Sequence, residues 1–147
     1  MALFTNKQTE FPLKRRWQLA ESMMDSARQI YHLVRDANNI KVRCRDDYLR
    51  RLHKQEKAIR LCKRLLGDYD IVRKTHTVSM FTLQELTLMT VDTLTFCRSW
   101  IRSDAKKYGY AAPNWIDDKT VEELDVEEMR EAGMQIPILN DAQLGEE

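Results

Sequence analysis

Apolar residues recur at three- and four-residue intervals along most of this chain, which is the spacing of one face of an α-helix. The first such stripe predicts a helix from about Leu13 to Ala37, interrupted by Asn38 and Asn39. Its apolar members are Leu13, Trp17, Ala20, Met23, Met24, Ala27, Tyr31 and Val34.

A second stripe predicts a helix from about Arg45 to Leu66, with Gly67 as its stop. The members of this stripe are Tyr48, Leu52, Gln55, Ile59, Cys62 and Leu66. Gln55 is its only polar member. The acidic pair Asp46–Asp47 lies where a helix N-terminus favours negative charge, so we interpret it as a cap and not as a catalytic pair.

A third stripe predicts a helix from about Thr82 to Asp104, after a connector from Asp68 to Phe81. Leu88 and Val91 lie outside this stripe, and in a chain this small we expect another copy or a partner to cover them. Several threonines lower the helix propensity of the segment, so a strand over TLTFC is the alternative. We prefer the helix because the stripe persists along the whole segment.

The composition changes beyond Tyr110. Pro113 breaks the helical pattern, and the capping-box spacing of Thr120 and Glu123 predicts a short helix within Asp117 to Ala132, closed near Gly133. Residues 137–147 have the composition of a flexible end.

Together these patterns predict an all-α fold: an up-down antiparallel helical bundle with three long helices, a short or missing fourth helix and an acidic C-terminal tail. The length of 147 residues suits one compact domain. We assign residues 1–110 to a basic helical-bundle domain and residues 111–147 to the tail. No segment has the length and apolar content of a membrane span or a signal peptide, and the three cysteines contain no CxxC pair. We therefore expect a cytoplasmic protein with reduced thiols.

A formal net charge of +1 hides a strong segregation of charge. Residues 1–110 carry 22 Lys+Arg against 12 Asp+Glu, whereas residues 111–147 carry 2 against 11. A basic body favours a polyanionic partner, because clustered positive charges attract a phosphate backbone; a solvated helical surface is the alternative. The acidic tail either aids solubility or folds over the basic surface and competes with a polyanion.

A basic stripe lies opposite the apolar seam of the second predicted helix. It consists of Arg50, Lys57 and Arg64, flanked by His53, Lys54 and Arg60 and preceded by Arg43. Between Lys41 and Arg64 there are 10 basic and 3 acidic residues, too few acids to neutralise the stripe through neighbouring turns. We expect this face to contact a phosphate backbone or an acidic protein surface, with plain exposure as the alternative. The aromatic residues do not interleave with it, so stacking on single-stranded bases is not indicated.

Catalytic patterns are absent from the sequence. No HExxH, GxSxG, Walker A or GxGxxG spacing occurs, and the four glycines are scattered. The three histidines are not spaced as metal ligands with any cysteine, and Cys62 and Cys97 have the spacing of small core hydrophobes. We expect a protein that binds macromolecules, with no enzymatic activity, no metal and no cofactor.

Three stretches, FPLKRRWQLAESM, DDYLRRLHKQEKAIRLCKRLL and LQELTLMTVDTLTFCRSWIRS, resemble one bacterial four-helix-bundle family. This family includes the accessory variability determinants of diversity-generating retroelements, and the resemblance covers Phe11 to Ser103. Its opening FP-K-x-RY-L pattern is matched by Phe11, Pro12, Lys14 or Arg15, Arg16, Trp17 and Leu19, with Trp in place of Tyr. Its closing Gly-x-Trp-Ile-like element is matched by Ser99, Trp100 and Ile101.

The resemblance implies a basic, barrel-like homopentamer that associates with the retroelement reverse transcriptase and its template RNA. Such a subunit supports error-prone cDNA synthesis and is not itself catalytic. The residues that would meet phosphates or the polymerase are Lys14, Arg15, Arg16, Arg43, Arg50, Arg51, Lys54, Lys57, Arg60 and Arg64. None of them would read base sequence. A family bundle has a further helix before the FP segment, so here the fourth helix is missing or comes from the connector or the tail.

Two other functions fit the same charge pattern. One is a structural or regulatory helical oligomer whose basic face meets an acidic protein partner. The other is a DNA-binding accessory protein of a mobile element.

Overall fold

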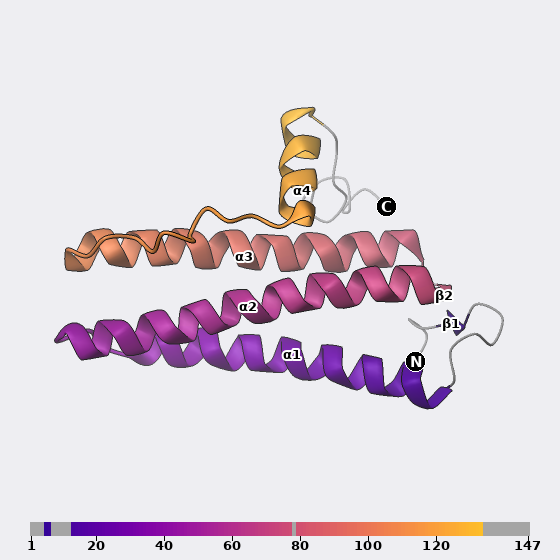
Figure 1. Cartoon of the computed structure of the whole chain (residues 1–147), viewed down its shortest axis with the longest axis horizontal. Helices are drawn as coiled ribbons and strands as arrows, with labels where there is room; N and C mark the ends of the chain where they lie inside the picture. The colour runs from indigo at the N-terminus through magenta and orange to yellow at the C-terminus, as the bar shows by residue number, and fades with distance from the viewer. Residues whose placement is uncertain (1–4, 7–12, 78, 134–147) are drawn as a thin grey trace, which may run out of the picture.

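Three long helices lie side by side, with the second in the middle. The computed structural model describes residues 5–6, 13–77 and 79–133. The helices are α1 (Leu13–Asn39), α2 (Arg45–Thr75) and α3 (Met80–Tyr108). Both α1 and α3 pack against α2, and Figure 1 shows the chain reversing its direction from each helix to the next. The predicted all-helical architecture is confirmed.

Two smaller features complete the described chain. Strand β1 (Thr5–Asn6) pairs antiparallel with β2 (His76–Thr77), directly after α2. The short helix α4 (Val121–Glu131) stands steeply across α3 in Figure 1. Among the helices of these residues, none combines the length and apolar content that crossing a lipid bilayer requires.

Gly67 does not end the second helix, and the prediction of a stop there is wrong. Helix α2 continues to Thr75, so most of the predicted connector is helical. Tyr69 and Val72 are buried beyond the glycine, which extends the apolar seam by two more turns. A glycine inside a helix costs about 1 kcal/mol relative to alanine, whereas burying two large side chains contributes several times as much. Tertiary burial therefore overrides the local signal.

The third helix is continuous, so the alternative strand over TLTFC is wrong. Its threonines are accommodated because the hydroxyls of Thr90 and Thr93 donate to the carbonyl oxygens of Leu86 and Met89, one turn earlier. Ser79 caps its start, and Gly109, with φ of 78°, ends it in the left-handed conformation.

The short fourth helix begins with the predicted capping box. The Thr120 hydroxyl accepts from the Glu123 backbone N–H at 3.2 Å, and the Glu123 carboxylate accepts from the Thr120 N–H at 2.6 Å. The helix starts at Val121 instead of Asp117, because residues 113–118 form turns. Ile116 and Val126 join the same core as the three long helices. The segment after α3 and the short fourth helix therefore share the core of the long helices.

Leu88 and Val91 are covered by their own chain, not by a second copy or a partner. Their side chains are 1% and 2% exposed. Val126 of α4 lies in the same buried cluster, which explains the second apolar face of α3. The prediction of an oligomer interface at these two residues is therefore corrected: the fourth helix supplies the cover.

Other apolar residues of α3 remain exposed. Met89 is 56% and Phe96 is 57% exposed, on the side that faces α1. With Tyr31 of α1, 61% exposed, they line shallow grooves between α1 and α3, one of which has Cys62 and Leu65 of α2 as its floor.

Candidate nucleic-acid interface

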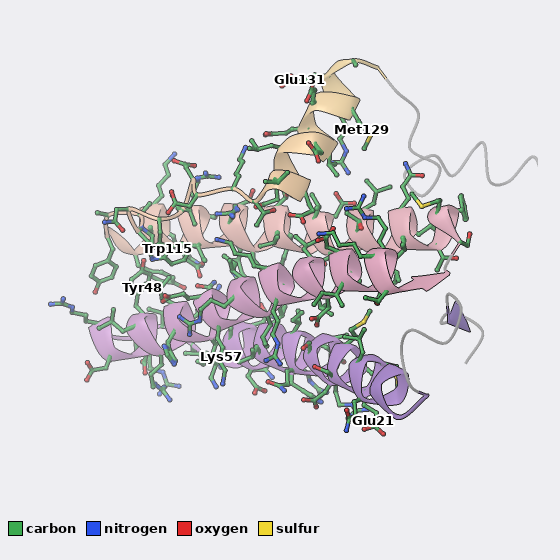
Figure 2. All side chains as sticks on the ribbon, turned by 45° about the vertical axis from the view of Figure 1, so that its right-hand side comes forward. Glu21, Tyr48, Lys57, Trp115, Met129 and Glu131 are labelled. Carbon is green, nitrogen blue, oxygen red and sulfur yellow. The ribbon has the colours of Figure 1, made fainter. Side chains whose placement is uncertain are left out.

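The basic stripe of α2 lies on the surface, opposite the seam that the helix buries. Arg50, Lys57 and Arg64 are exposed, while Gln55 and Ile59 of the seam are 0% and 2% exposed. In the view of Figure 2, α3 lies between Lys57 on α2 and the two labelled residues of α4, Met129 and Glu131. The described part of the acidic segment therefore packs on α3 and leaves this stripe uncovered.

Acidic neighbours neutralise more of the stripe than its composition indicates. Arg50 pairs with Asp47 at 2.9 Å, and Arg60 pairs with Glu56 at 3.1 Å, both within one turn of the helix. Such exposed pairs stabilise a protein by at most about 1 kcal/mol. A phosphate can therefore replace the carboxylate at little cost.

Arg64 lies near Asp68, one turn further along α2. Burial raises the pKa of the Asp68 carboxyl above its ordinary value, and the positive charge of Arg64 opposes this rise. Lys57 has no ion-pair partner among the residues that the structure describes. Lys54 is only partly exposed and lies at the edge of the stripe. The charge of Lys57 is therefore available to a ligand.

Arg51 is not a surface residue, and the prediction that it contacts phosphate is wrong. Its side chain is 13% exposed. Its guanidinium donates from Nε and Nη2 to Asp104 of α3, at 2.7 and 3.0 Å, and lies 5.0 Å from the centre of the Trp100 ring. Gln55 Nε2 donates to the same carboxylate at 2.9 Å. Since its position falls between the seam and the stripe, Arg51 ties α2 to α3 instead of facing solvent.

The residues before α2 divide into capping and surface roles. The backbone N–H of Arg43 donates to Asp47 Oδ2 at 3.1 Å, and the Arg43 side chain is exposed. Hydrogen bonds from the Arg50 side chain and then from the Arg43 backbone lower the pKa of Asp47. Asp47 therefore acts as a cap, as predicted. Lys14, Arg15 and Arg16 belong to the first turn of α1, and their side chains lie outside the described residues.

Tertiary structure adds basic residues that the linear stripe did not include. Tyr48 of α2 stacks on Tyr110 with ring centres 4.2 Å apart, which places the start of α2 beside the end of α3. The exposed cations at this end of the molecule are Lys41, Arg43, Arg45, Arg50, Lys106 and Lys107. We call this group the basic end. Lys106 and Lys107 are far from α2 in sequence, and only the reversal of the chain brings them there.

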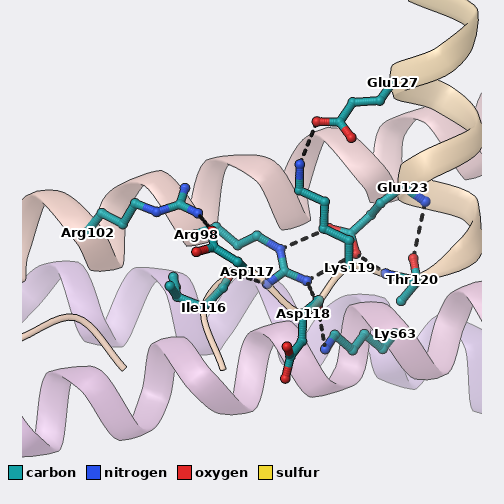
Figure 3. A network of polar contacts seen from close by, with 10 residues as sticks. All are labelled: Lys63, Arg98, Arg102, Ile116, Asp117, Asp118, Lys119, Thr120, Glu123 and Glu127. Carbon is teal, nitrogen blue, oxygen red and sulfur yellow. Dashed lines mark hydrogen bonds and ion pairs between the residues drawn. The ribbon is translucent and has the colours of Figure 1, made fainter. Parts of the chain in front are cut away.

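A second polar centre, around Arg98, was not singled out from the sequence (Figure 3). The Arg98 side chain is 3% exposed, and its guanidinium donates to both carboxylate oxygens of Glu123 at 2.9 and 3.0 Å. It also donates to the carbonyl oxygens of Ile116 at 2.5 Å and Asp118 at 2.6 Å. These bonds fasten α4 and the segment before it to α3.

Glu123 remains ionised in this setting. Burial alone raises the pKa of its carboxyl, but hydrogen bonds from Arg98 and Thr120 outweigh burial and lower the pKa below the ordinary 4.5. A carboxylate held in this way stabilises the fold and is poorly suited to donate a proton in a reaction.

A metal site and a reactive buried thiol are two further kinds of site that the described residues do not support. They contain no group of three or more His, Cys, Asp or Glu placed to hold a metal ion. Burial raises the pKa of the Cys62 thiol to about 12 and that of the Cys97 thiol to about 11, so neither thiol forms a reactive thiolate near neutral pH.

Comparison with protein-family models, with curated proteins and with solved structures finds no match to this chain. The family resemblance stated above therefore stays a prediction.

Proposed function

We propose that this protein is a non-catalytic accessory subunit that binds the phosphate backbone of a nucleic acid. The contacts come from the exposed stripe of α2 and the adjoining basic end. The observation that carries the proposal is the separation of charge in space: exposed cations gather on α2 and at one end of the bundle, while the acidic helix α4 packs on α3, away from the stripe.

Two physical arguments support this surface as a phosphate site. Its cations are exposed, and their ion pairs are weak enough to exchange, so binding requires little reorganisation. Each phosphate neutralised releases condensed counterions, which favours a surface with several cations over a single strong pocket. Contacts of this type position a nucleic acid and do not select its sequence.

The test is binding of a labelled RNA hairpin and a DNA duplex across a series of salt concentrations. We expect Lys57→Glu with Arg64→Glu to weaken binding about tenfold or more and to reduce the magnitude of the salt slope by about 1–2. The matched control is Arg28→Glu with Arg35→Glu, which changes the same charge at exposed positions of α1. Equal losses in the two variants would mean that net charge attracts nucleic acid without a defined surface.

On the strength of the resemblance we also propose the partner and the assembly. The chain works in the cytoplasm as a homo-oligomer of up-down antiparallel bundles, in which α4 takes the place of the missing fourth helix. It binds the reverse transcriptase and template RNA of a retroelement. Co-purification of the full chain with that polymerase, together with light scattering of the complex, tests this part. A monomer that binds neither RNA nor the polymerase would contradict this proposal. The remaining candidate partner of the stripe would then be an acidic protein surface.

A further inference from the structure

A groove lies between α3 and α4, away from the basic stripe. It has a volume of about 640 Å³. Its apolar lining consists of Met80, Leu83, Leu88, Val126, Met129 and Ala132. Its charged lining consists of Glu122, Asp125 and Glu128 of α4 and Arg73 of α2. An apolar floor therefore lies beside a row of carboxylates.

Among the described residues, these three carboxylates lack ion-pair partners of the kind that the other face of α4 has. Glu123 and Glu127 pair with Arg98 and Lys119, at 2.9 and 2.5 Å, and Arg130 of the same helix pairs with Asp92 at 2.7 Å. Within the part of the chain that the structure describes, no ion pair involves Glu122, Asp125 or Glu128.

Arg73 does not neutralise the groove, because its guanidinium donates to Asp70 at 2.6 Å. Among the described residues, the groove therefore keeps a negative wall whose carboxylates are not paired with a cation. Charge of one sign along an apolar groove favours a ligand of the opposite sign with an apolar side.

The spacing of the carboxylates suits a helical ligand. They recur every third residue, so they form a row on one side of α4, with neighbours about 4.5 Å apart along the axis. A helix with Lys or Arg at three- and four-residue intervals presents cations at a similar spacing, beside an apolar face.

Two methionines let the groove adapt to the shape of its ligand. Met80 is 67% exposed at the start of α3, and Met129 is partly exposed on α4. Flexible thioether side chains can repack around apolar groups of different shapes.

We infer that the groove between α3 and α4 docks a basic amphipathic helix of a partner protein. The apolar face of that helix lies on the exposed Met80 and the partly exposed Met129, above a floor formed by Leu83 and Val126, and its cations meet the three carboxylates. The protein thus carries two recognition surfaces of opposite charge: a basic one for phosphates and an acidic, apolar one for a basic protein segment.

The test measures the fluorescence anisotropy of a labelled peptide with the full chain. The probe is a helical peptide of roughly fourteen residues, or about four turns, with leucines on one face and lysines on the other. Two further peptides carry glutamate in place of lysine, or glutamine in place of leucine. We expect only the leucine–lysine peptide to bind. Equal binding of the glutamine–lysine peptide would show attraction to charge without docking and would overturn the inference.

Matched variants locate the site. Glu122→Gln, Asp125→Asn and Glu128→Gln together should weaken binding about tenfold or more. The control Glu21→Gln, Asp36→Asn and Glu131→Gln removes the same charge at exposed positions that do not line the groove, and should leave the affinity within about threefold. Met80→Ser with Met129→Ser should weaken binding without a change in charge. Equal losses in the test and control triples would overturn the inference.

The chain's own C-terminal segment is the rival occupant, since residues 134–139 (MQIPIL) follow the groove residue Ala132 closely in sequence. In the full chain, Ile136→Ser with Ile138→Ser distinguishes the two. An affinity within about threefold of the wild type supports a partner helix. If the wild-type chain does not bind the leucine–lysine peptide and the variant does, the groove is occupied by the chain's own residues 134–139. A loss of RNA binding has no bearing on this outcome, because the RNA test depends on Lys57 and Arg64.

Discussion

Arg98 shows how one buried charge shapes the fold around it. An arginine is rarely buried unless its donors are satisfied. Here a bidentate carboxylate and two carbonyl oxygens take up those donors, from a segment that begins 18 residues further along the chain. The arginine therefore requires the chain after α3 to fold back, and it fixes where α4 begins.

Replacing this guanidinium should be costly. Arg98→Met leaves the Glu123 carboxylate, 4% exposed, without its cation, so we expect a loss of about 3–5 kcal/mol in the free energy of unfolding. Denaturant unfolding measures the loss, and hydrogen exchange shows whether α4 opens first. The control is Arg102→Met, because the Arg102–Asp117 pair is exposed and should contribute less than about 1 kcal/mol. Similar losses in both variants would mean that burial of the Arg98 pair does not fasten α4.

The same pair predicts a dependence on pH. The pKa of Glu123 lies below its ordinary 4.5 in the folded chain, so its contribution to stability is full above about pH 4.5 and is lost as the pH falls through the lowered value. Glu123→Gln should therefore cost several kcal/mol near pH 7 and less near pH 3, because the carboxylate stabilises the wild type less once the pH falls below the ordinary pKa of 4.5. Urea unfolding of both proteins at these pH values measures the difference. A difference that stays constant with pH would contradict the assigned ionisation.

At the scale of the elements, helix ends depend on backbone conformation as well as on residue type. Gly67 and Gly109 each follow a long apolar stripe in the sequence. Of these two glycines, only Gly109 adopts a positive φ and ends its helix. Gly67 lies inside α2, where apolar residues on both sides of it are buried. A glycine is thus a stop only where no further burial compensates for its cost.

These two glycines predict opposite effects of the same substitution. Gly67→Ala should raise the free energy of unfolding by about 0.5–1 kcal/mol, because an added Cβ has no atom within 4 Å and the unfolded chain loses freedom. Gly109→Ala should lower it by about 1–2 kcal/mol, because φ of 78° strains an L-residue. Thermal or urea unfolding of both variants measures the sign. Destabilisation by Gly67→Ala would contradict the continuous helix.

At the scale of the whole molecule, the two recognition surfaces lie on different elements. The stripe belongs to α2, whereas the acidic groove belongs mainly to α3 and α4. Charges more than about 10 Å apart in moderate salt are largely screened from each other. Binding at one surface should therefore be nearly independent of substitutions in the other.

Crossed variants test this independence. Lys57→Glu with Arg64→Glu should reduce RNA binding and leave the affinity for the leucine–lysine peptide within about threefold, and the Glu122, Asp125 and Glu128 triple should do the reverse. A combined variant should show the sum of the two losses in free energy. Coupling of more than about 1 kcal/mol between the sets would mean that one surface serves both ligands.

The sequence by itself determined the helical class, the three long helices, the seam of α2 and the capping box of α4. These depend on local periodicity and on hydrogen bonds within one turn, which a linear pattern records. It also placed Arg50, Lys57 and Arg64 on the surface, because they lie opposite a clear apolar seam.

Only the tertiary structure decided which helix positions between the apolar seam and the exposed face are buried, and which residues cover them. Arg51 and Arg98 are both arginines on helices, but contacts with Asp104 and Glu123, distant in sequence, withdraw them from solvent. The cover over Leu88 and Val91, the continuation of α2 past Gly67 and the groove beside α4 have the same origin. Each is set by contacts between residues far apart in the chain, whose free energy exceeds the local preferences that a sequence pattern displays.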